Sequence, residues 1–278
     1  EEISSQTETV LKQSLEEGIK PILFINKIDR LFTELELENE QIKTKLNRII
    51  STFNGLIESF KIKENQTKWK INPEDSSLLL GSALHGWGFS LKQFMDKGFN
   101  FSQLREYYTD PDSNKKFELK GIFPIHTCVL DAVISILPNP VEAQSYRVPI
   151  IWDGSENSKI FESMVNCDPN GPLVLCIQKV EREPYGLVAT ARIFSGMLDN
   201  KKDMYLVNED KIEKINQVAI FMGAHRDHAD HIPAGNIAAI VGLKFVRSGE
   251  TLIEKDFKEE AQRFKSVKYI SEPVMTIA

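Results

Sequence analysis

Apolar residues in the first half of the chain fall into two patterns. In four segments they recur at three- and four-residue steps, which is the repeat of one buried face of an α-helix. These segments are residues 7–17, 34–60, 90–97 and 125–137. Two short continuous apolar runs, residues 22–25 and 78–83, lie between the first three of them. Such runs are typical of strands buried on both faces of a parallel sheet, so the order predicts an α/β domain.

The pattern changes near Pro140. Beyond it come short β-rich runs separated by turn dipeptides such as Ser195-Gly196 and Ser248-Gly249. The runs are residues 173–180, 187–194, 204–207, 212–221, 236–241 and 251–253. Their lengths and spacing predict an all-β barrel that follows the α/β domain.

Composition fits a folded protein and limits its partners. With 278 residues, 41% of them apolar, the chain is long enough for two domains with buried cores. Its formal charge of −6 gives no general positive field, so any binding to a ribonucleoprotein has to be local. No apolar run reaches the roughly 18 residues that a membrane span needs. The chain starts at Glu1 with neither a methionine nor a signal-peptide pattern, so we expect this N-terminus to be cut.

The main candidate for chemistry is Asn26-Lys27-Ile28-Asp29, an NKxD sequence that directly follows the first apolar run. Open α/β sheets bind ligands at the carboxyl ends of their strands, where this motif lies. An ionised Asp29 accepts through two oxygens, so it can take both N1–H and the exocyclic amine of guanine, a donor pair that adenine lacks. Asn26 can bind the base edge or hold the neighbouring loop, and the Lys27 stem can lie along the base face.

The second apolar run ends in Gly81-Ser82-Ala83, where a backbone N–H can donate to guanine O6. Small residues permit that close approach. NKxD alone is a weak signal, and the strand context together with this second loop strengthens it. The alternatives are that Asp29 only caps a helix and that Gly81 only permits a turn. The predicted guanine-binding residues are Asn26, Lys27, Asp29, Ser82 and Ala83.

These loops and their flanks resemble the translational GTPases. The similar strings are QTETVL (6–11), KPILFINKIDR (20–30), GSALHGWGF (81–89), PNPVEAQSYR (138–147), NCDPNGPL (166–173), IPAGNI (232–237) and SEPVMTIA (271–278). In the family they correspond to the helix after the second switch region, the two guanine loops, three parts of domain II and the first strand of domain III. The resemblance covers the whole chain and fits the archaeal type.

The resemblance implies part of a P-loop GTPase domain, with a parallel sheet and helices, at residues 1–139. It further implies an all-β barrel, domain II, at residues 140–267 and the start of domain III at 268–278, so we expect both ends to be cut from a longer protein. The implied function is that of a GTP-dependent ribosomal translocase, which moves tRNA and mRNA after peptide-bond formation. GTP or GDP with Mg²⁺ is expected in the intact protein. The implied partners are ribosome, tRNA, mRNA and guanine nucleotide in the cytoplasm, without membrane or DNA.

The phosphate-binding half of a GTPase site is absent from the sequence. No G-x-x-x-x-G-K-[ST] string occurs, and the family's switch regions and catalytic histidine have no counterpart, so no catalytic residue is assigned. A DxxG string at residues 168–171 follows NKxD, which is the wrong order, so we interpret it as a turn. We therefore expect this chain alone to bind nucleotide weakly or not at all and to be inactive. Two alternatives stay open: a related ribosome-associated GTPase of biogenesis or termination, or a non-catalytic ribosome- or partner-binding module.

Histidines and cysteines give weaker signals. His225, His228 and His231 are spaced by three residues, but their surroundings predict a strand end and a polar loop, which favours solvated side chains over a metal site. His85 follows the second guanine loop and is expected to contact a neighbouring helix rather than nucleotide. The three cysteines, Cys128 among them, form no CxxC pair, which argues against disulfides and zinc and indicates a reducing compartment.

Overall fold

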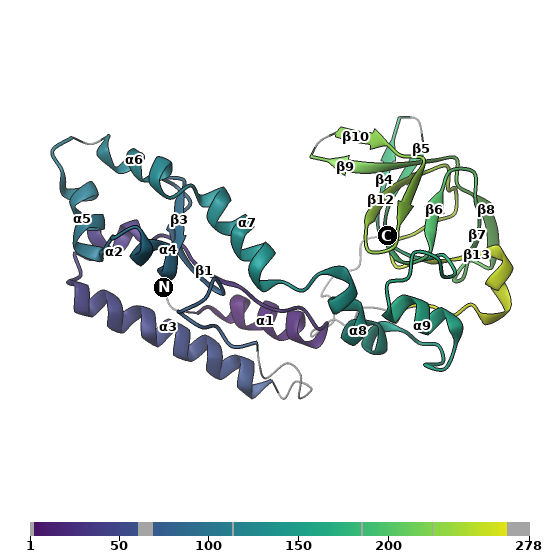
Figure 1. The fold of residues 1–278 in the computed structure, drawn as a ribbon, viewed down its shortest axis with the longest axis horizontal. Helices are drawn as coiled ribbons and strands as arrows, with labels where there is room; N and C mark the ends of the chain where they lie inside the picture. The colour runs from purple at the N-terminus through teal and green to yellow at the C-terminus, as the bar shows by residue number, and fades with distance from the viewer. Residues whose placement is uncertain (1–2, 61–68, 113, 185, 224, 266–278) are drawn as a thin grey trace. The chain divides into compact units, whose positions relative to one another are not determined.

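The structure, a computed structural model, describes residues 3–60, 69–112, 114–184, 186–223 and 225–265. The chain divides into two compact units, Glu1–Leu137 and Pro138–Ala278. Figure 1 shows them coloured from purple to yellow along the chain. The SEPVMTIA string lies outside the described residues, so its similarity to domain III stays a prediction.

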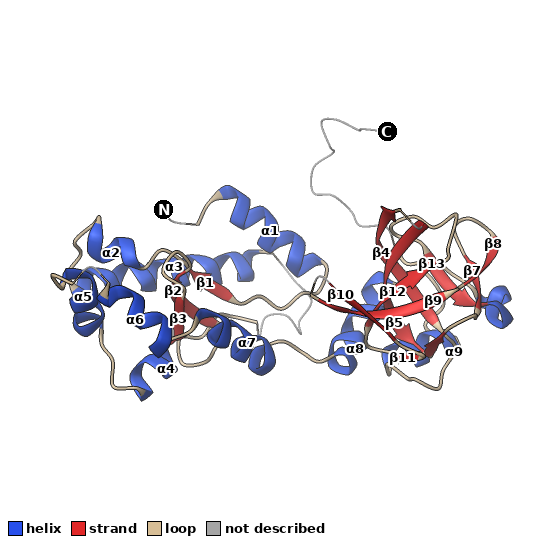
Figure 2. Cartoon of the chain, turned by 90° about the horizontal axis from the view of Figure 1, so that it is seen from above, coloured by secondary structure: helices blue, strands red, loops and turns tan. Residues whose placement is uncertain are grey.

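The first unit is a three-stranded sheet with helices on both faces (Figure 2). Its strands are β1 (Leu23–Ile25), β2 (Leu78–Ser82) and β3 (Trp87–Ser90). Its helices are α1 (Ser5–Glu16), α2 (Asp29–Thr33), α3 (Asn39–Ser59), α4 (Leu91–Asp96), α5 (Phe101–Thr109), α6 (Lys115–Ile122) and α7 (Ile125–Ile136). β2 is central, parallel to β1 and antiparallel to β3. The predicted α/β class is confirmed, although the sheet is mixed.

Side chains of β2 alternate between two hydrophobic layers because successive residues of a strand point to opposite faces. Leu78 and Leu80 belong to the core that includes α1 and α3, whereas Leu79 packs in a smaller cluster with α7. All of β2 is buried, as predicted. The prediction for β1 is wrong: Leu23–Ile25 are only half-buried, since β1 is the edge strand of the sheet formed by the described residues.

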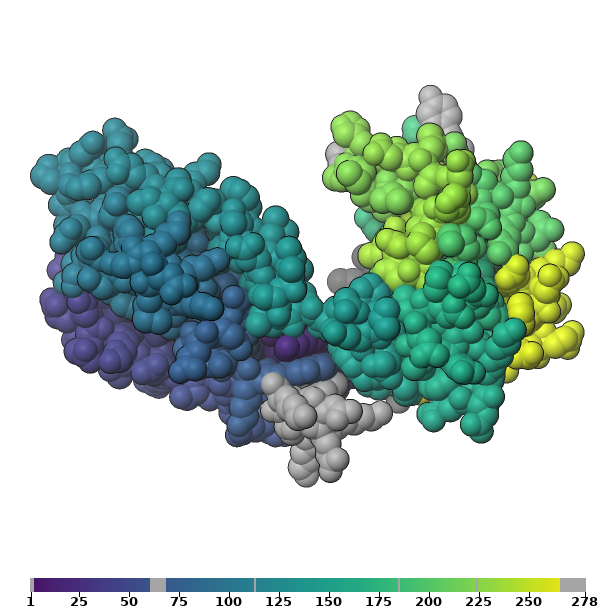
Figure 3. Space-filling model, in the orientation of Figure 1, coloured from purple at the N-terminus to yellow at the C-terminus, as the bar shows by residue number. Residues whose placement is uncertain are grey.

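Helix α3 begins later than the apolar repeat predicts, at Asn39 rather than near residue 34. The side chain of Gln41 accepts the Glu38 amide at 2.8 Å, and the Glu38 side chain accepts the Gln41 amide. This capping box satisfies amides that a helix start leaves unpaired and fixes the boundary. Leu35, counted in the repeat, is 49% exposed. The outer side of α3 forms part of the surface of the first unit (Figure 3).

Besides the short α2, three elements of the first unit have no counterpart in the sequence patterns. α5 fully buries only Leu104 and α6 only Leu119, and neither is among the predicted helices, although Phe101, Leu104 and Tyr108 recur at helical spacing on α5. β3 carries a glycine in the Trp87–Ser90 segment and reads as part of a loop. It forms because β2 offers it a complete row of partners, from Leu79 opposite Ser90 to Ser82 opposite Trp87.

The second unit begins with two helices that the sequence patterns do not predict, α8 (Pro140–Ile151) and α9 (Lys159–Val165). Asn139 caps α8 by accepting the Glu142 amide at 3.0 Å, and Pro140 suits the first turn. The strands that follow are β4 (Val174–Glu183), β5 (Gly186–Ser195), β6 (Met197–Asp199), β7 (Asp203–Leu206), β8 (Lys211–Lys214), β9 (Gln217–Met222), β10 (His225–His228), β11 (His231–Pro233), β12 (Ile237–Val241) and β13 (Thr251–Glu254).

Eight of these strands form one antiparallel sheet in the order β10-β9-β12-β5-β4-β13-β7-β8, and β6 pairs with β11. The sheet encloses an apolar core, into which β5 contributes Ala189, Ala191 and Ile193 at alternate positions. The predicted all-β barrel class is thereby confirmed. The predicted run at 212–221 is two strands: β8 pairs with β7 and β9 with β12, so the chain changes partner at Ile215.

We expect Gly81→Ala to destabilise the first unit. A Cβ at this position would lie 2.6 Å from the Trp87 carbonyl oxygen and 2.9 Å from Gly88 Cα, both of which are backbone atoms that cannot move aside independently. The expected loss is about 1–3 kcal/mol, the usual effect of overpacking. Hydrogen exchange of the β2 and β3 amides under native conditions measures it.

Gly55→Ala is the matched control. Nothing lies within 4 Å of a Cβ there, and alanine is the better helix former by up to about 1 kcal/mol. Exchange in this variant should be as slow as in the unmodified chain, or slower. Equal protection of β2 in the two variants would contradict the argument.

Candidate functional site

The two predicted loops lie next to each other because β1 and β2 are parallel neighbours. Their register places Phe24 opposite Leu79 and Ile25 opposite Leu80, so both strands end at the same edge of the sheet. The first loop, residues 26–29, follows β1. The second loop, residues 82–85, contains the end of β2 and the turn after it.

The side-chain oxygen of Asn26 joins the two loops. Asn26 Oδ1 accepts the backbone N–H of Lys27 at 2.8 Å and that of Ala83 at 2.9 Å. A further link runs from the Ile28 N–H to the Gly81 carbonyl at 3.1 Å. Of the two roles that the sequence leaves open for Asn26, the structure therefore shows the contact with the neighbouring loop.

Lys27 has a left-handed backbone conformation, with φ of 64°. For a residue other than glycine this conformation costs about 1–2 kcal/mol. Hydrogen bonds stabilise both backbone polar groups of Lys27. Asn26 Oδ1 accepts the Lys27 N–H, and the Arg30 N–H donates to the Lys27 carbonyl at 3.1 Å. The Lys27 side chain is exposed, which leaves its stem free to lie along a base.

Asp29 is buried, with 7% of its surface exposed, at the first position of α2. Its Oδ1 is a buried acceptor with no hydrogen-bond partner. Leaving such a group unpaired costs about 1–3 kcal/mol. The alternative that Asp29 caps the helix finds no support, since the N-cap of α2 is Ile28 and no side chain bonds to the helix start. An unpaired buried carboxylate oxygen is suited to a ligand that brings its own donors.

Ser82 and Ala83 have different environments. Ser82 is fully buried, and its Oγ accepts the His85 N–H at 3.3 Å. Ala83 is exposed, and its amide is already engaged by Asn26. That amide can reach guanine O6 only by sharing its hydrogen between two acceptors.

His85 contacts a neighbouring helix, in line with the favoured interpretation. Its Nδ1 lies 2.9 Å from Tyr108 Oη on α5 and 3.2 Å from Ser82 Oγ. Burial lowers the pKa of His85, although Asp29 opposes the shift, so the ring is neutral at pH 7. Trp87 Nε1 donates to the same Tyr108 oxygen at 2.8 Å.

Tyr108 and Trp87 are the site residues that sequence reasoning missed. Burial raises the pKa of Tyr108 to about 12, which keeps its hydroxyl protonated. Tyr108 recurs at helical spacing with Phe101 and Leu104, so its position in the sequence is that of a core residue. A lone tyrosine carries no motif, so nothing in a single sequence marks it as a site residue.

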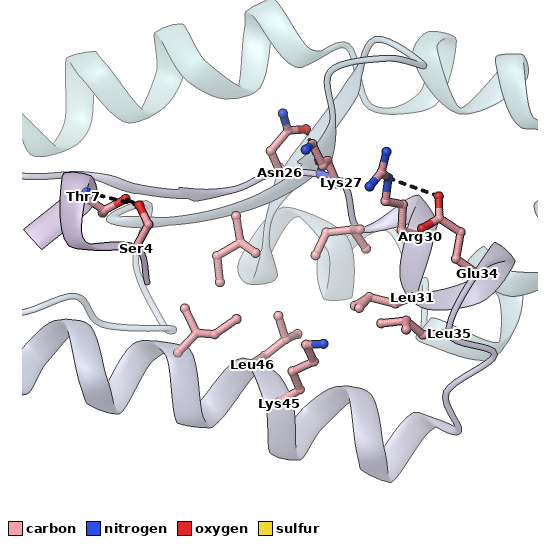
Figure 4. Close-up of a pocket in the computed structure, with 13 residues that line it drawn as sticks. Ser4, Thr7, Asn26, Lys27, Arg30, Leu31, Glu34, Leu35, Lys45 and Leu46 are labelled. Carbon is pink, nitrogen blue, oxygen red and sulfur yellow. Dashed lines mark hydrogen bonds and ion pairs between the residues drawn. The ribbon is translucent and has the colours of Figure 1, made fainter. Parts of the chain in front are cut away.

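A pocket of about 430 Å³ opens beside the first loop, lined from α1, α2 and α3 (Figure 4). Asn26 and Lys27 line it, whereas Asp29, Ser82 and Ala83 do not. The rest of the lining is Ser4, Thr7, Ile25, Ile28, Arg30, Leu31, Glu34, Leu35, Lys45, Leu46 and Ile49. The unpaired carboxylate oxygen of Asp29 therefore belongs to the first loop and not to the lining of this pocket.

The other candidate residues show no site. His225 and His228 lie on β10 and His231 on β11, all exposed. Among the described residues, no group of three or more His, Cys, Asp or Glu side chains is arranged to hold a metal. Cys128 is buried and Cys176 half-buried, and burial raises the pKa of each thiol to about 11.

The DxxG string forms a turn, as interpreted from the sequence. Asp168 Oδ1 accepts the Asn170 N–H at 2.9 Å, and the Asp168 carbonyl accepts the Gly171 N–H at 3.3 Å. This turn follows α9 and belongs to the second unit, whereas the NKxD loop belongs to the first. Within the described ranges, no helix is both long and apolar enough to cross a membrane.

Comparison with known proteins shows the family. Residues 1–139 match the family model described as Elongation factor Tu GTP binding domain. Residues 174–255 match the one described as Elongation factor G domain 2. The chain belongs to the translational GTPases. The NKxD loop and the second loop both lie in the part of this translational GTPase that matches the GTP-binding model.

Several relatives of this translational GTPase carry the name Elongation factor 2. The chain is 47% identical over 279 residues to those of Metallosphaera sedula and Saccharolobus solfataricus, and 44% identical over 281 residues to that of Korarchaeum cryptofilum. Each alignment covers 100% of this chain and 38% of the relative. The chain therefore spans 38% of the length of these relatives, which are archaeal.

The first loop offers a buried acceptor that suits the donors of a guanine base. The unpaired Oδ1 of Asp29 needs donors, and guanine presents two on one edge. Mg²⁺ needs several oxygen ligands in octahedral geometry, and among the described residues no group of three or more His, Cys, Asp or Glu side chains is arranged to hold a metal. Mg²⁺ therefore has no assigned ligand in this chain.

We expect Asn26→Ala to separate the two loops. The substitution removes the acceptor of two amides, so hydrogen exchange at Lys27 and Ala83 should become faster by about tenfold, the effect of one net hydrogen bond. Asn26→Asp is the control, because a carboxylate oxygen still accepts both N–H groups and only the Nδ2 amide is lost. If the Ala83 amide of Asn26→Ala exchanges as slowly as in the unmodified chain, the hydrogen bond between Asn26 and Ala83 does not stabilise the second loop.

Proposed function

We propose that this chain forms the guanine-reading and β-barrel portion of a GTP-dependent ribosomal translocase of the elongation factor 2 type. In this proposal GTP hydrolysis drives movement of tRNA and mRNA after peptide-bond formation, and the ribosome is the partner. The observation that carries it is the buried, unpaired Oδ1 of Asp29 beside a loop joined to it through Asn26. The names of the relatives, and the family models that this chain matches, support the ribosomal role.

Base selection follows from the donors and acceptors of the loops. Asp29 accepts N1–H and the exocyclic amine of guanine, and the Lys27 stem covers one face of the ring. Ala83 shares its amide with O6. Adenine would bring a lone pair at N1 toward the carboxylate and leave Asp29 unpaired, and a site built to hydrogen-bond a ligand discriminates strongly against one that lacks the donors.

Phosphate chemistry needs residues beyond these 278. A translocase has to cradle the phosphates and orient the attacking water, and this sequence contains no G-x-x-x-x-G-K-[ST] loop for that task. We therefore assign this chain base recognition and assign hydrolysis to other parts of a longer protein. Its net charge of −6 restricts ribosome contacts to local surfaces.

We expect the chain to bind purine mononucleotides in the order GMP, IMP, AMP. Guanine brings two donors to Asp29, hypoxanthine one and adenine none. Asp29→Asn should weaken GMP binding by tenfold or more, since each hydrogen bond to a charged group contributes about 1.5–3 kcal/mol. It should also remove the preference for GMP over IMP, because an amide N–H then faces the exocyclic amine. Amide shifts of Lys27 and Ala83 during NMR titration report binding even at millimolar affinity.

Asp96→Asn is the control for this experiment. Asp96 is an exposed carboxylate at the end of α4, without a side-chain partner among the described residues. The control should keep the order of the three nucleotides. An unmodified chain that binds AMP as well as GMP would refute guanine recognition by these loops.

We expect no GTP hydrolysis by this chain alone. Without a phosphate-binding loop the γ-phosphate has no charge stabilisation, and that stabilisation provides most of the acceleration in phosphoryl transfer. Phosphate release from GTP with Mg²⁺ should equal the rate without protein. A protein-dependent rate that Asp29→Asn reduces would contradict this division of roles.

A further inference from the structure

Tyr108 contacts the supports of both loops of the guanine site. From α5 its ring stacks on Phe32 of α2, with centroids 6.0 Å apart and planes at 20°. Its hydroxyl meets Trp87 Nε1 at 2.8 Å and His85 Nδ1 at 2.9 Å. Since α2 begins with Asp29 and His85 belongs to the second loop, one side chain links the carboxylate of the first loop to the second loop.

The hydrogens of this contact follow from donor and acceptor counts. The indole N–H of Trp87 can only donate, so Tyr108 Oη accepts it. The Tyr108 hydrogen is then available to His85 Nδ1, which carries a lone pair when the imidazole is neutral. Burial favours the neutral ring by lowering the pKa of His85. In this arrangement the remaining ring hydrogen is on Nε2, and the donors run from Trp87 through Tyr108 to His85.

The loop contacts extend this connection to the base. The backbone N–H of His85 donates to Ser82 Oγ at 3.3 Å. This bond closes the turn that carries Ala83, so a shift of His85 would also shift that turn. In the proposed function, Asp29 and Ala83 form hydrogen bonds with the same edge of one guanine base. A displacement of about 1 Å between them would place one of the two contacts outside hydrogen-bond range.

We propose that Tyr108 is a positioning residue of the guanine site, which sets the separation of the second loop from Asp29 through His85 and Phe32. This inference rests on the proposed function, because it concerns the same loops. Tyr108 acts through its neighbours and does not bind the base. Its contribution should therefore appear in guanine affinity and in the tautomer of His85, and not in binding of AMP.

Tyr108→Phe and Tyr107→Phe form a matched pair on α5. The first removes the hydroxyl that meets Trp87 and His85. The second removes the hydroxyl of the adjacent tyrosine, which makes no hydrogen bond among the described residues and whose ring packs on Phe99. We expect Tyr108→Phe to weaken GMP binding to the full chain about three- to tenfold, the effect of one net hydrogen bond, while Tyr107→Phe matches the unmodified chain.

The tautomer of His85 provides a readout that a general loss of stability would not change. Long-range proton–nitrogen NMR spectra distinguish Nδ1–H from Nε2–H imidazole. The unmodified chain and Tyr107→Phe should show the Nε2–H form. Tyr108→Phe should shift His85 toward the Nδ1–H form, because Nδ1 loses its shorter contact, with the Tyr108 hydroxyl, and an Nδ1–H can then donate to Ser82 Oγ, 3.2 Å away. An unchanged tautomer in Tyr108→Phe would overturn the assignment of Tyr108 as donor.

The outcomes separate this inference from the proposed function. If the unmodified chain does not prefer GMP over AMP, the proposed function and this inference both fail. If that preference is present and Tyr108→Phe binds GMP like Tyr107→Phe, the positioning role alone fails. Weaker GMP binding confined to Tyr108→Phe, with the tautomer shift, supports both.

His85→Phe decides the question if Tyr108→Phe does not fold. It keeps a ring against Tyr108 and Phe117 and removes both nitrogens. GMP binding should weaken about as much as expected for Tyr108→Phe, and if both variants fold their effects should not add, since they break the same contact. Unchanged GMP affinity in His85→Phe would overturn the positioning role.

Discussion

The side-chain oxygen of Asn26 is the acceptor that joins the first residues of both loops. Parallel pairing of β1 with β2 places the two strand ends at the same edge, but pairing fixes only the strands and not the loops beyond them. Asn26 Oδ1 takes the amides of Lys27 and Ala83 together and so fixes the first residues after each strand. Parallel strands cannot be joined by a tight turn, because their connection has to cross the sheet. The Asn26 side chain, together with the bond from the Ile28 N–H to the Gly81 carbonyl, supplies the contact that a hairpin turn would supply between antiparallel strands.

β3 and the aromatic residues that pack with it also support the second loop. β3 returns along β2 and brings Trp87 and Phe89 into a stacked aromatic core with Phe94, at centroid distances of 5.6 and 4.2 Å. This core is rigid because stacked rings leave little free volume. Gly81 allows β3 to approach so closely, since its missing Cβ is where the Trp87 carbonyl lies. β3 and the aromatic core therefore support one side of the second loop, and Asn26 and Tyr108 contact its other side.

Much of this arrangement follows from sequence patterns, because its signals are local. NKxD directly after an apolar run identifies the first loop, and the β-rich runs of the second unit coincide with strands to within a few residues. The exceptions have physical causes. Residues 212–221 are continuous in sequence but change partner at Ile215, and partner choice is a long-range property. α5 and α6 are short helices that fully bury one residue each, so their periodic signal is weak in a sequence window. Tyr108 acts through contacts that form only in the folded chain.

The loops themselves destabilise the fold slightly. The left-handed backbone of Lys27 and the unpaired Oδ1 of Asp29 each cost about 1–3 kcal/mol, and neither improves the core. A chain keeps such unfavourable features only where the surrounding structure holds them in place. Here the hydrogen bonds to Asn26 and the aromatic core hold the two loops. A guanine base would pair the Asp29 oxygen and so remove one of these costs, which means that binding would stabilise the folded first unit by linkage. The features that make the free loops unfavourable are therefore the same ones that make them selective, because a base without the two donors leaves Asp29 as costly as before.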